Sequence, residues 1–102
     1  ENFPETLAGV VRDSIRKQEQ FKLSRHETVD DPIRSIETLS HRFGLSQSET
    51  EVVRQSYYLE QGATMFHIIN AFTRAAQDSN LETLQAYRLE KAGGQILNLV
   101  RP

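Results

Sequence analysis

The sequence has no cysteine and no tryptophan, and it has only three prolines and five glycines among 102 residues. Without cysteine the chain has no disulfide, no thiolate ligand for zinc and no cysteine nucleophile, and this absence favours a cytoplasmic location. Few residues interrupt a helix, and the β-branched residues are scattered rather than grouped in alternating runs. This pattern predicts an all-α fold with no strand.

Charge and hydropathy set further limits. Twelve lysines and arginines stand against fourteen aspartates and glutamates, a net charge of −2, which excludes the strongly basic composition of a dedicated nucleic-acid-binding domain. No apolar run approaches the roughly 20 residues that a membrane span needs, so we expect no membrane contact. The length suits one core and predicts a single domain over residues 1–102. Because the sequence begins at Glu1 rather than methionine, we expect it to be part of a longer protein.

The first third of the chain is the most polar. Residues 1–24 predict a long first helix, with Pro4 in its first turn and an apolar stripe that thins out after Ile15. Residues 24–31 have little apolar content and predict a solvated, partly disordered connector. The remainder, residues 32–102, is expected to form the helical core.

Start and stop signals divide this core into helices. Asp31 is placed to cap a second helix with Pro32 at its first position, and Gly44 follows in a position that suits a left-handed residue. Ser46 and Glu49 have the spacing of a capping box, which predicts the start of a third helix that ends near Gly62.

Two further helices complete the predicted bundle. Thr64 is a candidate cap for a fourth helix, which has the strongest apolar stripe, and a fifth helix begins near Asn80. The helical spacing continues through Gly93 and Gly94, each of which costs roughly 1 kcal/mol relative to alanine. We therefore expect both glycines at a close helix crossing, in a single compact bundle of about five helices with the fourth and fifth at its centre.

The last third of the chain resembles a known family. Thr64, Phe66, the Asn70–Ala71 pair, the run from Thr73 to Gln77, and Glu90 followed by Gly93 and Gly94 match in order and spacing the carboxy-terminal part of a phage- and plasmid-borne family, domain of unknown function 932. The resemblance implies a mobile-element protein in which this chain is a helical tail after a larger amino-terminal domain. It implies no catalytic residues.

Candidate chemistry is sparse. His26, His41 and His67 do not stand three or four residues from one another, so they do not predict a metal site on one helical face. Asp30 and Asp31 have the character of a solvated turn before a capped helix rather than of a catalytic pair. We expect no catalytic residues, no metal and no cofactor, and hence no enzyme.

Two polar residues lie in the predicted fourth helix. Asn70 stands between Ile69 and Ala71, where a buried amide needs hydrogen-bond partners. We expect it to fix helix packing, with ligand binding as the alternative. Thr73 is expected to bond its own helix and to be structural as well.

A basic patch is the remaining feature. The segment from residue 12 to residue 25 has five positive and two negative side chains, and Arg12 and Arg16 are neighbours on a helix. The candidate contact residues are Arg12, Arg16, Lys17, Phe21, Lys22 and Arg25. Cations at this spacing meet phosphate oxygens, and Phe21 can stack on a base or enter a groove of a partner. A solvated helix face is the alternative.

Two functional hypotheses follow. The first is a non-catalytic helical interaction or assembly module of a phage- or plasmid-type protein, with a protein partner or self-association. The second is a nucleic-acid-binding accessory domain that uses the basic first helix. A comparison of the third and fourth helices with a helix-turn-helix is disfavoured, because Met65, Phe66 and Ile68 are expected to be buried at the start of the second helix of the pair.

Overall fold

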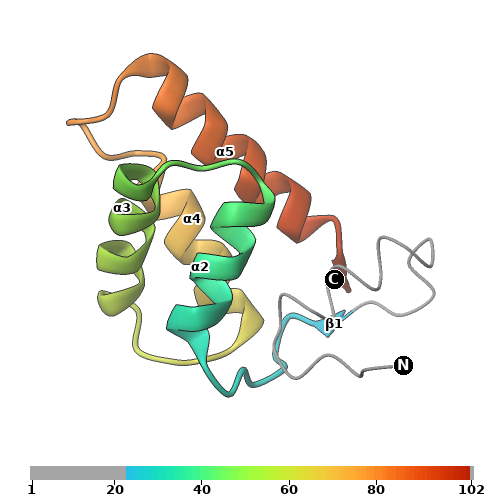
Figure 1. The fold of residues 1–102 in the computed structure, drawn as a ribbon. Coiled ribbons are helices and arrows are strands. Elements are labelled where there is room, and N and C mark those ends of the chain that lie inside the picture. The colour runs from blue at the N-terminus through green and yellow to red at the C-terminus, as the bar shows by residue number, and fades with distance from the viewer. Residues whose placement is uncertain (1–22, 102) are drawn as a thin grey trace.

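The computed structural model describes residues 23–101, in which helices joined by turns are accompanied by one two-stranded pair (Figure 1). Within this range there are four helices: α2 (Pro32–Arg42), α3 (Gln47–Tyr58), α4 (Met65–Ala75) and α5 (Thr83–Leu97). The expected first helix over residues 1–24 falls almost wholly outside the described residues. The fold class is therefore all-α as predicted, and residues 23–101 contain four of the about five expected helices.

The ends of α2 follow the local signals. The Asp31 side chain accepts a hydrogen bond from the Arg34 N–H at 3.2 Å, and Pro32 is the first helical residue. An unpaired first-turn N–H is thereby satisfied. Gly44, two residues after the last residue of α2, has a φ of +74°, a conformation that costs glycine little and other residues more. The expected boundaries of this helix are confirmed.

The capping box of α3 is also present. Ser46 Oγ accepts from the Glu49 N–H at 3.2 Å, and Glu49 Oε1 accepts from the Ser46 N–H at 2.9 Å. This reciprocal pairing satisfies two amide donors that the start of a helix leaves open. The helix ends at Tyr58, four residues before the expected stop at Gly62.

The turn between α3 and α4 is built around Gly62. Its carbonyl accepts from the Tyr57 hydroxyl at 2.8 Å, and a Cβ at this position would overlap the imidazole ring of His67. His67 Nδ1 in turn accepts from the Thr64 N–H at 3.2 Å. Thr64 is the N-cap residue of α4 as predicted, and a histidine takes the place that glutamate has in the α3 box.

The core is built on α4, which packs against both α3 and α5, while α2 packs against α3. Ile68 and Phe72 of α4, Leu89 and Ile96 of α5 and Val53 of α3 are fully buried. Phe66 is 43% exposed, so the expectation that it is buried is wrong. Met65, Ile68 and Phe72 repeat at three- and four-residue spacing and form the buried face of α4. Phe66 follows Met65 by about 100° around the helix and so lies off that face.

The connector is less solvated than expected. Val29 is buried at 7% exposure and donates its N–H to the Ala63 carbonyl at 2.7 Å. The Glu27 carbonyl accepts from the Met65 N–H at 3.0 Å, and the Arg25 carbonyl accepts from the Phe66 N–H at 2.9 Å. These two N–H groups belong to the first residues of α4. The first amides of a helix have no intrahelical partner, so the connector supplies what α4 lacks.

The absence of strands was also a wrong prediction. Strand β1 (Leu23–Ser24) pairs in parallel with β2 (Val100–Arg101), with Leu23 opposite Val100, and Thr28 forms an antiparallel bridge with Thr64. These pairings join residues more than 30 positions apart. The helical periodicity on which the prediction relied carries no information about such contacts.

The two adjacent glycines of α5 differ. A Cβ on Gly93 would lie 3.4 Å from Phe72 Cβ of α4, so the helices approach closely there. Gly94 is exposed, and a Cβ on it would meet nothing within 4 Å. Close packing at Gly94 was therefore a wrong prediction. Successive helical residues point about 100° apart, so one glycine faces α4 and the next faces solvent.

This difference predicts opposite effects of two substitutions. Gly93→Leu should destabilise the fold by about 1–3 kcal/mol because the side chain has no room against Phe72. Gly94→Ala should stabilise it by up to about 1 kcal/mol, because alanine has a higher helix propensity than glycine and the position is exposed. Urea unfolding of both variants measures the two changes. Destabilisation by Gly94→Ala would contradict the exposed position.

Candidate functional site

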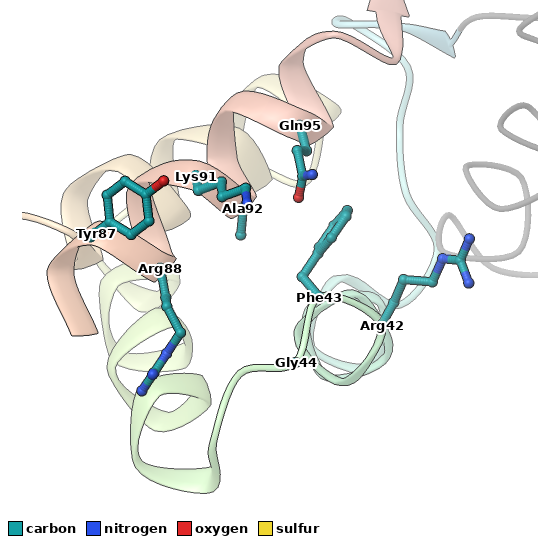
Figure 2. A pocket seen from close by; sticks show the side chains of 8 residues that line it. All are labelled: Arg42, Phe43, Gly44, Tyr87, Arg88, Lys91, Ala92 and Gln95. Carbon is teal, nitrogen blue, oxygen red and sulfur yellow. The ribbon is translucent and has the colours of Figure 1, made fainter. Parts of the chain in front are cut away.

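A groove of about 510 Å³ lies between α5 and the turn that joins α2 to α3 (Figure 2). We call it the α2–α5 groove. Its lining residues are Arg42, Phe43, Gly44, Tyr87, Arg88, Lys91, Ala92 and Gln95.

The end of α2 forms one wall. Phe43 follows the last helical residue, and its half-buried side chain extends from the turn toward Gln95 of α5 (Figure 2). Gly44 continues the wall with a positive φ, so the backbone turns away from α2 directly after the ring. Arg42 is exposed at the edge of this wall. The Arg42 side chain extends away from α5, whereas the Phe43 ring extends toward it (Figure 2).

One face of α5 forms the other wall. Tyr87, Lys91 and Gln95 are spaced four residues apart, which places them on one side of a helix. The Tyr87 side chain is 57% exposed, and Figure 2 shows Lys91 beside its ring. The opposite side of α5 is buried through Leu89 and Ile96. The packing of the buried face of α5 therefore fixes the orientation of the face that lines the groove.

The charge of the groove is positive. Three of its lining residues are cations and none is a carboxylate. The carboxylate within α5, Glu90, does not line it. Arg42 and Lys91 make no ion pair with another of residues 23–101, whereas Arg88 is paired with Glu49. Among residues 23–101, Arg42 and Lys91 are thus the two groove cations without a carboxylate partner.

The Arg88–Glu49 pair joins α5 to α3. The Glu49 side chain is fully buried, and that of Arg88 is 39% exposed. Burial by itself raises the pKa of Glu49, but hydrogen bonds from Arg88 and from the Ser46 N–H outweigh it and hold the pKa below its usual value of 4.5. Glu49 is thus ionised in the folded protein, and its charge directs Arg88 toward α3 (Figure 2).

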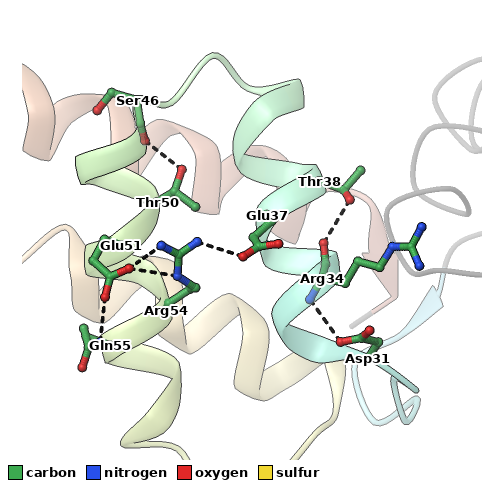
Figure 3. A network of polar contacts seen from close by, with 9 residues as sticks. All are labelled: Asp31, Arg34, Glu37, Thr38, Ser46, Thr50, Glu51, Arg54 and Gln55. Carbon is green, nitrogen blue, oxygen red and sulfur yellow. Dashed lines mark hydrogen bonds and ion pairs between the residues drawn. The ribbon is translucent and has the colours of Figure 1, made fainter.

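A second, smaller cleft of about 180 Å³ lies between α2 and α3, with Glu37, Thr50 and Arg54 in its lining (Figure 3). Arg54 bonds Glu37 at 2.9 Å and also pairs with Glu51, and Thr50 Oγ1 donates to the Ser46 carbonyl at 2.8 Å. These polar groups satisfy one another. We therefore interpret this cleft as a structural contact between the two helices.

Most residues of the predicted basic patch cannot be compared with the structure. Arg12, Arg16, Lys17, Phe21 and Lys22 lie outside the described residues. Arg25 is half-buried, and its carbonyl accepts from the Phe66 N–H. Its backbone therefore holds the connector against α4, while the patch itself stays a prediction.

Asn70 and Thr73 occupy different surroundings. Asn70 is half-buried and its Nδ2 lies 3.5 Å from Glu60 Oε1, and Glu60 also pairs with Arg74 at 2.7 Å. The structure thus gives Asn70 a carboxylate partner on the α3–α4 turn. Thr73 is exposed on α4 beside Gly93.

Sequence reasoning missed the groove. Its residues come from two segments about 45 positions apart, and no motif joins them. A partial signal was present in α5, where Tyr87, Lys91 and Gln95 repeat at helical spacing without a carboxylate among them. Phe43 continues the apolar stripe of α2 by four residues after Leu39, and it packs against the core. What the stripe did not reveal is that the same ring also borders the groove.

Over residues 23–101, no group of three or more potential metal ligands comes together. In the same part of the chain no helix combines the length and the apolar character that crossing a bilayer demands. No family model, no curated protein and no solved structure matches this chain.

The buried Glu49 predicts a pH-dependent stability. Because its pKa is lowered on folding, its contribution is present above pH 4.5 and is lost as the pH falls through the folded-state pKa. The difference in unfolding free energy between the wild type and Glu49→Gln should therefore shrink as the pH falls below 4.5. Urea unfolding at pH 7 and at pH 3 tests this, and a difference that stays constant would contradict it.

Removal of the other partner tests the same pair. Arg88→Met leaves a buried carboxylate without its cation and should destabilise the protein by about 1.5–3 kcal/mol at pH 7. Arg34→Met, at an exposed position of α2, is the matched control and should change stability by less than about 0.5 kcal/mol. Equal effects of the two substitutions would contradict the role of Arg88.

Proposed function

We propose that this chain is a non-catalytic binding module, and that the α2–α5 groove is its contact surface for an anionic partner. The observation that carries this proposal is the combination of the exposed Tyr87 ring with Arg42 and Lys91 in a groove that no carboxylate lines. Hydration of an exposed aromatic ring is unfavourable in the isolated protein. Aromatic residues and arginines are also enriched in contact surfaces.

The groove also suits a binding role because its walls are rigid. α5 is held by its buried face against α4 and by the Arg88–Glu49 pair to α3. The other wall follows a capped helix and a turn with a defined positive φ. Side chains on such elements lose less freedom on binding than side chains on a loose loop, which favours affinity.

The resemblance of the last third to domain of unknown function 932 is consistent with an interaction role in a phage- or plasmid-type protein, and membership stays a proposal. Assembly with a protein partner or self-association fits a groove of this kind. A cytoplasmic location is proposed on the absence of cysteine alone. Nucleic-acid binding by the basic segment at residues 12–25 stays a separate prediction.

Nuclear magnetic resonance of the ¹⁵N-labelled chain tests the proposal. We expect titration with an anionic polymer, either poly-L-glutamate or the oligonucleotide dT12, to shift backbone amides along the groove, including those of Phe43, Gly44 and Lys91. A double substitution, Arg42→Glu with Lys91→Glu, should reduce the affinity at least tenfold, because it replaces attraction by repulsion.

Arg34→Glu is the matched control, because Arg34 is an exposed cation near the start of the same helix as Arg42. It should leave the affinity within about twofold. If neither polymer shifts the groove amides, or if Arg34→Glu weakens binding as much as the double substitution, the groove is not the contact surface and the proposed function fails.

A further inference from the structure

We infer that the anionic partner of the α2–α5 groove is a single-stranded nucleic acid. The inference rests on the proposed function and specifies it. It is carried by three features of one surface: a half-exposed tyrosine ring, a second aromatic ring, and cations at the edges of the groove. Nonspecific single-strand sites combine stacking rings with a basic track in this way.

The rings supply the contact with bases. Tyr87 is 57% exposed on α5, and Phe43 extends from the opposite wall toward Gln95 (Figure 2). A base has an apolar face that stacks on such rings and a polar edge that bonds an amide. Gln95, which lines the same groove, offers both a donor and an acceptor to that edge.

The cations supply the contact with phosphates. Lys91 lies beside the Tyr87 ring and Arg42 stands at the α2 edge (Figure 2). Since Arg88 is paired with Glu49, two phosphate contacts are expected. Each contact on a single strand contributes about −0.7 to the slope of log affinity against log salt. The expected slope is therefore about −1.4, a weak salt dependence that agrees with the overall charge of −2.

An acidic peptide helix is a poorer occupant. A groove that accepts an amphipathic helix needs an apolar floor for residues at helical spacing. In the α2–α5 groove, apolar side chains other than the two aromatic ones are limited to Ala92, which is only 2% exposed, and the rest of the lining is Arg42, Gly44, Arg88, Lys91 and Gln95. Rings with cations and an amide therefore favour a base and phosphate over an apolar helix face.

A duplex is disfavoured for a related reason. Its bases are stacked on one another, so their faces are not available to Tyr87 or Phe43 unless a base leaves the helix, which costs free energy. A flexible single strand has no such cost. We therefore expect dT12 to bind more tightly than a duplex of twelve base pairs.

Fluorescence anisotropy of labelled dT12 with the full chain at low salt tests the inference. Tyr87→Ala should weaken binding at least fivefold through the loss of one stacked base, and Tyr87→Phe should keep the wild-type affinity. Tyr58→Ala is the matched control, because Tyr58 is an equally exposed tyrosine at the far end of α3 from Gly44. Circular dichroism checks that each variant is folded.

The outcomes separate the inference from the proposed function. If poly-L-glutamate shifts the groove amides and dT12 does not, or if the duplex binds as tightly as dT12, the inference fails and the proposed function stands. If dT12 binds but Tyr87→Ala has no effect, the contact lies elsewhere. If Arg12→Glu and Arg16→Glu weaken dT12 binding and Tyr87→Ala does not, the contact lies in the basic segment at residues 12–25. If neither polymer reaches the groove, both fail.

Discussion

Burial of one face of α4 is the constraint on which the rest of the structure depends. α3 and α5 both pack on this helix, and Phe72 and Ile68 at its centre are fully buried. Gly93 allows α5 to approach α4 closely beside Phe72. The connector also depends on α4, because its carbonyls accept the amides that open the helix. The orientation of α3 and of α5, including the outer face of α5, follows from this packing.

One side chain links the helical framework to the groove. Glu49 accepts a hydrogen bond from Ser46 at the start of α3 and holds Arg88 of α5. Its carboxylate is fully buried, so a single charge serves both as a helix cap and as the tie between two helices. Because Arg88 is used in this way, the groove cations that have no carboxylate partner within the described range are Arg42 and Lys91. The fold therefore determines which charges a ligand meets.

Local signals predicted the fold where the physics is local. The caps at Asp31 and Ser46 and the turn at Gly44 involve groups within four residues of one another, and all three are present. Long-range pairing was not predictable in this way. Val29 is buried because it meets the α3–α4 turn, and the pairing of β1 with β2 joins the two ends of the described range. No periodicity in the sequence records these contacts.

The sequence by itself determined the caps at Asp31, Ser46 and Thr64 and the apolar stripe of the core, because each depends on residues one or two helical turns apart. Only the tertiary structure decided that Gly93 faces α4 and Gly94 faces solvent, since both glycines fit the same helical pattern. It likewise brought Phe43 of the α2–α3 turn opposite Tyr87 and Lys91 of α5. The two walls of the groove meet because α5 packs on α4, α4 packs on α3 and α3 packs on α2. That relation exists in the packed core and not in the order of the residues.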